Sequence, residues 1–173
     1  MELKKAFLSD LIDLKKICIA AYSLNFYNHW NDGGLEWYVN KEFSTERLTS
    51  DLTDINMEYY FIQHNLKVVG FIKICTNSRP NLQIENSVEL EKIYVLPECK
   101  GIGIGKLALK DIIKRIEERG KTKMFLSVID TNENAISFYK KLGFEFHSKT
   151  TLDIPYFKEE LKGMHRMVKE FNP

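Results

Sequence analysis

Cysteine is scarce in this chain and long apolar runs are missing, and each absence excludes a class of protein. The three cysteines, Cys18, Cys75 and Cys99, are widely spaced, and no two of them form a Cys-x-x-Cys pair. We therefore expect neither a disulfide framework nor a zinc site, and a reducing cytoplasm is the simplest location. No apolar run reaches the roughly 18 residues of a membrane span, and no basic segment leads into an apolar one at the N-terminus. Neither secretion nor membrane insertion is expected.

A large net charge is also missing, because 25 Lys and Arg stand against 24 Asp and Glu. The halves differ, however: residues 1–99 carry −4 and residues 100–173 carry +5. One explanation is that both charge surpluses lie on solvated faces. The alternative is that the positive later half binds a phosphorylated cofactor and the negative earlier half binds a cationic substrate. The later positive residues alternate with acids, so a nucleic-acid-binding stripe is not expected. The length of 173 residues and the 44% hydrophobic content predict one globular domain spanning 1–173.

The stretch Val88–Lys106 combines a strand, a turn, a glycine-rich loop and the start of a helix. Val88–Val95 mixes β-branched, aromatic and charged residues, which is typical of a partly buried strand. Leu96-Pro97 ends that strand, since proline has no N–H to donate. After the loop Lys100–Lys106, apolar residues recur at the spacing of a buried helix face: Leu109, Ile112, Ile113 and Ile116. This order presents backbone N–H groups to a negatively charged ligand.

Three kinds of phosphate-binding loop compete for this stretch. A nucleotide P-loop fails, because Lys100 stands where its first glycine belongs and Leu107 where a Ser or Thr belongs. A dinucleotide fingerprint matches Gly103, Gly105 and Ala108, but the loop is too long and lies mid-chain. The third pattern, [Gln/Arg]-x-x-Gly-x-[Gly/Ala] after a strand ending in Tyr-Val, resembles the acetyl-CoA pyrophosphate loop of the GNAT N-acetyltransferase superfamily. Lys100 in place of Gln or Arg is its one departure.

The remaining elements follow from periodicity and from capping residues. Ser9 or Asp10 caps a first helix, and Ser44 or Thr45 opens another that runs through Leu52. Two β-rich runs around Asn65-Leu66 predict an antiparallel hairpin. The predicted strands are Glu2–Phe7, Glu58–His64, Lys67–Cys75, Val88–Val95, Lys121–Ile129, Phe144–Leu152 and Met164–Phe171, and Thr76–Ser87 is a predicted loop.

A second motif lies in Asn132–Phe144. It contains Asn132-x-x-Ala135-x-x-Phe138-Tyr139-x-x-Leu142-Gly143-Phe144, which is similar to the second GNAT signature, N-x-x-A-x-x-[LF]-Y-x-x-x-G-F. With two motifs in the correct order, the chain is identified as a member of that superfamily, and it looks most like the bacterial spermidine/spermine N-acetyltransferases. The resemblance implies an α/β fold: a mixed, mostly antiparallel sheet of about seven strands, splayed at its central strands and flanked by about four helices.

The resemblance also implies acetyl transfer from acetyl-CoA to a primary amine by direct attack, without a metal or a covalent enzyme intermediate. An alkylamine with a pKa near ~10.4 is protonated at neutral pH, so a base must take a proton from it. Glu89 and Glu91 lie two apart on one strand and hence on one face of the sheet. Either carboxylate is a candidate base that acts directly or through water. Alternatively, one or both pair with Lys or Arg on the exposed side of the sheet.

The other site residues rest on the motif matches. Tyr139 matches the general acid that protonates the leaving thiolate, although its helical spacing also suits a core tyrosine. Asn132 matches a cofactor contact, and a helix N-cap is an equally good physical use for it. The resemblance implies backbone contacts to the acetyl group and pantetheine arm from Ile93, Tyr94 and Val95. The implied pyrophosphate contacts are Lys100, Gly101, Ile102, Gly103, Ile104, Gly105 and Lys106.

An aromatic cluster, Tyr22, Phe26, Tyr27 and Trp30, lies before the turn at Gly33-Gly34. It lines a substrate pocket or forms core between two helices. A polyamine is the first acceptor that we expect, and an amine of a peptide or protein is the second. A non-catalytic acyl-CoA-binding module remains the alternative from another class. The expected partner is a small-molecule amine, and the expected state is a monomer or a homodimer.

Overall fold

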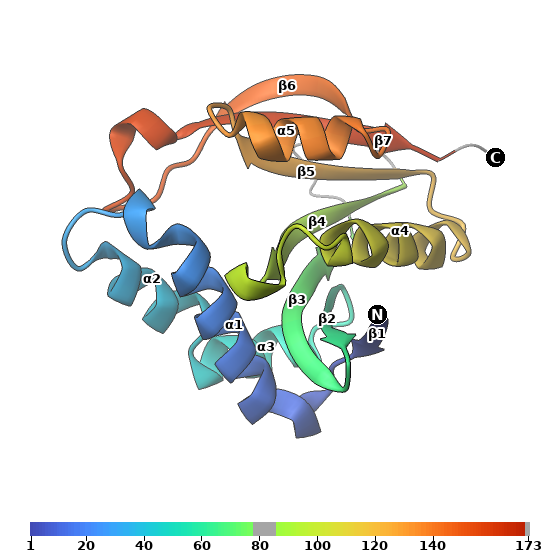
Figure 1. Ribbon diagram of the computed structural model, residues 1–173, viewed down its shortest axis with the longest axis horizontal. Coiled ribbons are helices and arrows are strands. Elements are labelled where there is room, and N and C mark those ends of the chain that lie inside the picture. The colour runs from blue at the N-terminus through green and yellow to red at the C-terminus, as the bar shows by residue number, and fades with distance from the viewer. Residues whose placement is uncertain (78–85, 172–173) are drawn as a thin grey trace.

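The computed structural model describes residues 1–77 and 86–171, and these form a seven-stranded sheet with helices on both faces (Figure 1). The strand order is β1-β2-β3-β4-β5-β7-β6, and every neighbouring pair except β4–β5 is antiparallel. The strands are β1 (Glu2–Lys5), β2 (Met57–His64), β3 (Lys67–Cys75), β4 (Ser87–Val95), β5 (Lys123–Ile129), β6 (Glu145–Thr151) and β7 (Gly163–Glu170). The mixed, mostly antiparallel sheet predicted from the sequence is confirmed.

The described residues also form five α-helices, where the sequence predicted about four. They are α1 (Leu11–Phe26), α2 (Gly34–Glu42), α3 (Thr45–Thr53), α4 (Ile104–Glu117) and α5 (Glu133–Lys140). Ser44 caps α3, because its hydroxyl accepts a hydrogen bond from the Arg47 N–H at 3.0 Å. Gly143, with φ +86°, follows α5 and ends it as expected. The hairpin turn has positive φ at Asn65 and Leu66, as a tight two-residue turn requires.

The sheet opens between its two central strands. β4 and β5 run parallel and pair only where Ser87–Glu89 lies beside Lys123–Phe125. Beyond that short ladder β4 continues to Val95 and β5 to Ile129, and the two strands diverge (Figure 1). The predicted splay is therefore confirmed, and it leaves the second half of β4 with an open edge. Most of the predicted loop Thr76–Ser87, residues 78–85, lies outside the described residues.

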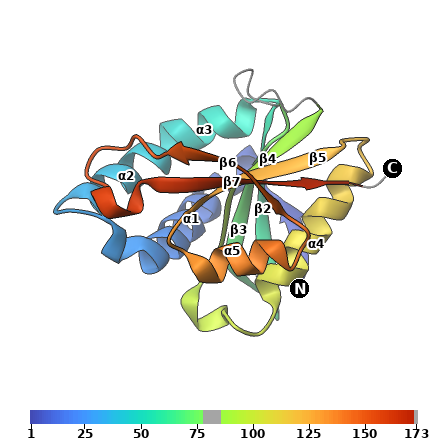
Figure 2. The same cartoon turned by 90° about the horizontal axis from the view of Figure 1, so that it is seen from above.

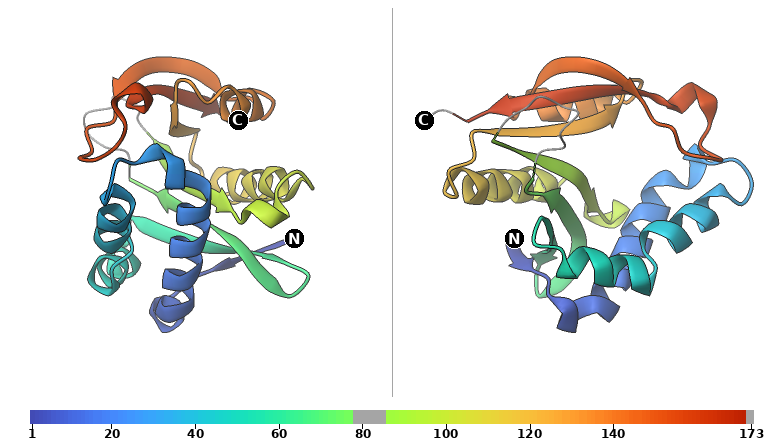
Figure 3. Two further views of the ribbon diagram at one scale, coloured as in Figure 1. Left: turned by 60° about the vertical axis from the view of Figure 1, so that its left-hand side comes forward. Right: turned by 180° about the vertical axis from the view of Figure 1, so that it is seen from behind.

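Helices cover the two faces of the sheet in separate groups. α4 and α5 lie on one face, and α1, α2 and α3 lie on the other (Figures 2 and 3). The α4 face packs aliphatic side chains, among them Leu90, Ile104, Leu109, Ile112, Ile113, Ile116 and Leu126. The α1–α3 face is rich in rings, among them Tyr22, Trp30, Tyr38, Phe43, Tyr59 and Phe71. Both clusters bury large apolar areas, which is the main stabilising contribution to such a fold.

Two further findings concern features expected from composition. Within the described ranges, no helix has the length and apolar character needed to cross a bilayer. The three cysteines are free thiols, and Cys18 is buried on the α1–α3 face, where burial raises the pKa of its thiol.

Candidate active site

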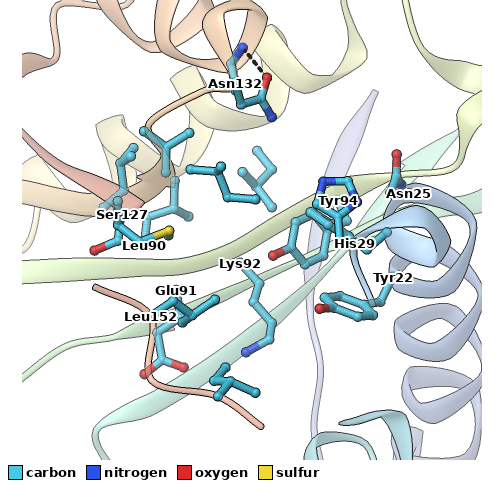
Figure 4. A pocket seen from close by; sticks show the side chains of 18 of the residues that line it. Tyr22, Asn25, His29, Leu90, Glu91, Lys92, Tyr94, Ser127, Asn132 and Leu152 are labelled. Atoms are coloured by element: carbon cyan, nitrogen blue, oxygen red, sulfur yellow. Dashed lines mark hydrogen bonds between the residues drawn. The ribbon is translucent and has the colours of Figure 1, made fainter. Parts of the chain in front are cut away.

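A cavity of about 820 Å³ lies where β4 and β5 separate, and Figure 4 shows part of its wall. Its lining comes mainly from α1, α2, β4, β5, α5 and the segment that joins β6 to β7, with further residues from α3, β6 and β7. The cavity brings together residues predicted from distant parts of the sequence. These are Tyr22, Phe26, Trp30, Glu89, Glu91, Ile93, Tyr94, Val95, Lys100, Asn132 and Tyr139.

The two candidate base residues, Glu89 and Glu91, share the sheet face that α1–α3 cover, as their spacing predicted. Opposite them on β3, Lys73 faces the same way, because its ammonium pairs with Glu91 on one side and with Asp51 of α3 on the other. Glu91 therefore does pair with a lysine, which was the alternative to its role as a base. Its cationic partner is buried inside the protein and does not lie on an exposed side of the sheet.

This pairing belongs to a buried network that the sequence analysis missed. Lys73 Nζ lies 2.9 Å from Asp51 Oδ2 and 2.9 Å from Glu91 Oε2, and its side chain is 1% exposed. Asp51 also accepts a hydrogen bond from the Tyr59 hydroxyl at 2.8 Å and pairs with Arg47 at 3.2 Å. The sequence contained one signal of this network. A charged residue, Lys73, stands between Ile72 and Ile74 and shares a face of β3 with the buried Phe71.

A β-bulge shapes the wall of the cavity at this point. The β3–β4 register moves from Lys73–Lys92 to Ile74–Leu90, so Glu91 is an extra residue in β4. As a result Glu91 and Lys92 both lie on the α1–α3 side, where Lys92 Nζ is 3.6 Å from a carboxylate oxygen of Glu42. Bulges re-aim side chains, and here the bulge adds a cation to a wall that strict alternation would have turned toward α4.

The open edge of β4 presents backbone groups to the cavity. The Leu96 N–H donates to Val69 O of β3 at 2.8 Å, so the backbone groups of Val95 and Ile93, at alternate positions, point the other way. The Val95 carbonyl accepts a hydrogen bond from Asn25 Nδ2 at 3.0 Å on that side. Asn25 Oδ1 is buried and has no hydrogen-bond partner among the described residues. This asparagine was missed because an isolated polar residue near a helix end carries no signal in one sequence.

Tyr139 lines the cavity from α5, across the opening from β4. Its ring contacts Phe138 and Phe144, with centroids 5.2 Å and 5.8 Å away. Burial raises the pKa of the Tyr139 phenol to about 12, so the phenol keeps its proton throughout the neutral range. Tyr94, whose side chain points into the cavity in Figure 4, also has its pKa raised by burial.

The glycine loop lies at the start of α4. Gly101 (φ +80°) and Gly103 (φ +86°) adopt the left-handed conformation, whereas Gly105 already belongs to the helix. Lys100 is the residue of the loop that lines the cavity, and Gly101–Lys106 are not among the described lining residues. The first turn of α4 contains no acidic residue, so its free N–H groups and positive dipole end are not offset by a carboxylate.

Asn132 precedes α5, and its Oδ1 accepts a hydrogen bond from the Ala135 N–H at 3.1 Å, drawn as the dashed line in Figure 4. The N-cap use of this residue is therefore present in the structure. Because Asn132 also lines the cavity, the same side chain lies beside the space in which the resemblance places the cofactor.

Three members of the predicted aromatic cluster lie at the boundary between the cavity and the core. Tyr22, Phe26 and Trp30 line the cavity and also pack with the α1–α3 core, and the Tyr22 and Phe26 rings stack at 4.7 Å. Tyr27 differs, because it is 63% exposed and lies outside the described lining. The chain leaves α1 at Phe26 and turns through a short 3-10 helix, which directs Tyr27 to solvent. Tyr27 therefore lies apart from the other three residues that were predicted to bind substrate.

The segment that joins β6 to β7 closes one end of the cavity against the α1–α2 connection. Trp30 and Phe157 form an isolated β-bridge, and their rings pack edge to face at 4.9 Å. The Asn31 N–H donates to Tyr156 O at 2.8 Å, and the Lys158 N–H donates to His29 O at 3.1 Å. The His29 side chain lines the cavity nearby, and burial and the charge of Lys158 lower its pKa.

The described residues contain no group of three or more His, Cys, Asp or Glu side chains placed to hold a metal ion. Glu89 and Glu91 line the cavity from β4, and Tyr139 lines it from α5.

Comparisons with known proteins agree with this fold. The chain resembles a spermidine N(1)-acetyltransferase of Thermoplasma acidophilum, with 24% identity over 149 residues that cover 84% of this chain and 88% of that protein. The crystal structure of the PaiA N-acetyltransferase from the same organism, in complex with coenzyme A, superimposes with a TM-score of 0.77 at 21% identity, covering 98% of both chains.

Other relatives carry general names. An uncharacterized N-acetyltransferase of Methanocaldococcus jannaschii is 34% identical over 111 residues, which are 64% of this chain and 44% of that protein. One from Lactobacillus delbrueckii is 25% identical over 107 residues and is covered to 62%. The chain thus spans less than two thirds of either relative.

The family model described as "Acetyltransferase (GNAT) family" matches residues 23–144. With two motifs, a splayed sheet and this match in agreement, the chain belongs to the GNAT acetyltransferase family.

Proposed function

We propose that this protein transfers an acetyl group from acetyl-CoA to a primary amine of a small acceptor in the cavity between β4 and β5. The observation that carries the proposal is one cavity lined at once by Tyr139, by Glu89 and Glu91, and by the open edge of β4. Family membership supports the reaction class. We further propose that the chain acts as a single domain in the cytoplasm, as a monomer or a homodimer.

The described residues fit acetyl-CoA at two places. The outward backbone groups of Ile93 and Val95, with the orphaned Asn25 Oδ1 nearby, are suited to a group that adds hydrogen bonds along the open edge of β4. The loop Lys100–Lys106 would hold the pyrophosphate at the N-terminus of α4, where nothing would meet a Cβ within 4 Å at Gly101 or Gly103. Acetyl-CoA, when bound, supplies the acetyl group as an activated thioester.

On the acceptor side, Glu89 or Glu91 takes a proton from the amine, directly or through one water. An ammonium group is not a nucleophile, so this step must precede or accompany attack. Both carboxylates also favour binding of the cationic acceptor. The N–H groups at the open edge of β4 stabilise negative charge that develops on the acetyl oxygen.

On the other side of the cavity, Tyr139 donates a proton to the departing sulfur. A thiolate is a weak base, with a conjugate acid near ~8.5. Because burial keeps the phenol protonated up to about pH 12, a donor is present at every pH at which the fold is expected to work. The acid on α5 and the bases on β4 face the same space from opposite walls.

A polyamine is the acceptor that we propose first, and a spermidine acetyltransferase among the relatives supports it. The cavity wall contains Glu42, Glu89 and Glu91.

A peptide acceptor is the second candidate, and it would need a groove between the N-terminal helices and the closing strands. The bridge between Trp30 and Phe157 crosses that route, which favours a small acceptor. A purely acyl-CoA-binding module would have no use for Tyr139 and two carboxylates in one cavity.

The test is release of free thiol from acetyl-CoA in the presence of spermidine, spermine, simple diamines, amino acids and short lysine peptides. We expect turnover with the polyamines and little with the peptides. Turnover confined to peptides would move the acceptor to a surface groove. Binding of acetyl-CoA without turnover of any amine would support the binding-module alternative instead.

A further inference from the structure

Burial of Lys73 is energetically unfavourable in itself, because an ammonium group inside a protein loses its hydration. Its side chain is 1% exposed on the central strand β3, between Asp51 and Glu91. A hydrophobic residue of similar volume at such a position is often neutral or stabilising. A charge at this position therefore calls for a use other than stability.

The contacts of Lys73 connect the interior to the cavity. On the inner side it meets Asp51, which is itself fixed by the Tyr59 hydroxyl at 2.8 Å and by Arg47 at 3.2 Å. On the outer side, 2.9 Å away, it meets Glu91, which lines the cavity. The two cations and two carboxylates of this group balance in formal charge.

The β-bulge lies at the same point. Lys73 is the residue of β3 against which β4 places both Glu91 and Lys92. An extra residue in a strand loosens the ladder locally, so its side chain needs another contact to hold a fixed direction. The ion pair with Lys73 supplies that contact for Glu91, just beyond the short ladder that joins β4 to β5.

We propose that Lys73 is a positioning residue of the acceptor site: anchored by Asp51, it fixes the Glu91 carboxylate on the cavity wall, where Glu91 binds the ammonium group of the acceptor. This role rests on the proposed acetyl transfer to an amine. A carboxylate offers about four lone-pair sites, so Glu91 has the capacity to accept hydrogen bonds from Lys73 and from a substrate together. Glu91 then binds and orients, while the removal of the proton falls to Glu89.

Titratable and charged groups surround Lys73 on every element packed against it. They are Cys18 of α1, Tyr38 and Glu42 of α2, Arg47 and Asp51 of α3, Tyr59 of β2, and Glu89, Glu91 and Lys92 of β4. Burial raises the pKa values of Cys18, Tyr38 and Tyr59, so these three remain neutral below pH 9.

The test compares the full-length wild-type protein with Lys73→Met and with Lys73→Met/Asp51→Asn. The double variant removes one charge of each sign, so no buried carboxylate remains at position 51 without its ammonium partner, and the loss of stability should be smaller than in the single variant. Lys67→Met, on an exposed position of the same strand, is the matched control. The probes are spermidine for turnover and ¹³C-glutamate NMR titration for Glu91, assigned with Glu91→Gln.

In the double variant we expect KM for spermidine to rise about tenfold or more while kcat changes less than threefold, as loss of one charge-assisted contact predicts. The Glu91 resonance should titrate at a higher pH than in the wild type, because its ammonium partner is gone. Lys67→Met should leave both unchanged. An unchanged KM in a folded double variant would overturn the proposal, and so would an unchanged Glu91 titration. The titration needs no turnover, so it still tests whether Lys73 holds the Glu91 carboxylate if the wild-type protein acetylates no amine and the proposed function fails.

Discussion

The two faces of the sheet use the same strands and very different side chains. On the α4 face the buried set is mostly aliphatic, and Ile112 and Ile116 are fully buried in it. On the α1–α3 face the buried set contains stacked rings and the ion pair of Lys73 with Asp51. The α4 face thus follows the rules for a stable core, whereas the α1–α3 face buries charge beside the cavity. Most of the aliphatic core therefore lies on the α4 face, and the acceptor-binding groups that we propose lie on the α1–α3 face.

The largest effect on stability is expected on the α4 face. Ile112→Ala removes a fully buried side chain from the middle of the aliphatic cluster and leaves a cavity. We expect the free energy of unfolding to fall by about 2–5 kcal/mol, measured by denaturant titration. At a temperature where the variant is folded, kcat/KM should match that of the wild type. A large loss of activity in the folded variant would show that this face is not separate from the site.

A matched pair of hydroxyl deletions compares the two faces directly. Tyr59 and Tyr60 are neighbours on β2 and point to opposite faces; Tyr59 donates to Asp51 at 2.8 Å and Tyr60 to Glu58 at 2.6 Å. Tyr59→Phe and Tyr60→Phe should each lower the free energy of unfolding by about 1–3 kcal/mol, since each removes a hydrogen bond to a carboxylate. KM for the amine should rise only in Tyr59→Phe, because its partner anchors Lys73. Equal KM values in the two variants would contradict the division between faces.

Two glycines at the start of α4 allow a smaller comparison. Gly103 has φ +86°, so Gly103→Ala strains the backbone and should cost about 1–2 kcal/mol of stability and weaken acetyl-CoA binding. Gly105 is helical, and an added Cβ would meet only Phe138, at 4.0 Å. Gly105→Ala should therefore keep or raise stability by up to about 1 kcal/mol. Calorimetry with coenzyme A provides the affinities, and a loss of affinity in Gly105→Ala alone would place the phosphates against that residue.

The smallest effect concerns pH. Burial raises the pKa of Tyr139 to about 12, so the folded state disfavours the phenolate relative to the unfolded chain. Its contribution to stability is fully present below pH ~10 and is lost as the pH rises toward 12. The melting temperatures of wild type and Tyr139→Phe should run parallel between pH 7 and 9, and the wild type should fall more steeply above pH 10. Parallel curves up to pH 11 would show that the phenol is not buried.

The sequence predicted the elements well because their signals are local. Strand alternation, the Ser44 cap and the Gly143 terminator each depend on a few neighbouring residues. The splay between β4 and β5 followed from resemblance to a family and not from spacing. Tyr27 was grouped with the aromatic cluster by proximity in the chain, and a change of helix type at Phe26 turned it outward.

The parts that the sequence did not predict depend on contacts between distant segments. The pairing of Lys73 with Asp51 joins β3 to α3, and no periodicity indicates which acid a buried lysine meets. The bulge that places Lys92 beside Glu91 breaks the alternation on which the strand prediction rests. Likewise, the contact of Trp30 with Phe157 joins opposite ends of the chain.

The most direct test of the central claim is thiol release by Tyr139→Phe, since the acetyl transfer that we propose uses the Tyr139 phenol as its acid. With the amine that the wild type prefers, we predict a loss of turnover of about 10²–10⁴-fold, with affinity for acetyl-CoA unchanged. Tyr27→Phe, which alters an exposed tyrosine outside the cavity lining, should retain full turnover. If Tyr139→Phe keeps turnover within threefold of the wild type, the phenol is not the proton donor and the chemistry assigned to this cavity is wrong.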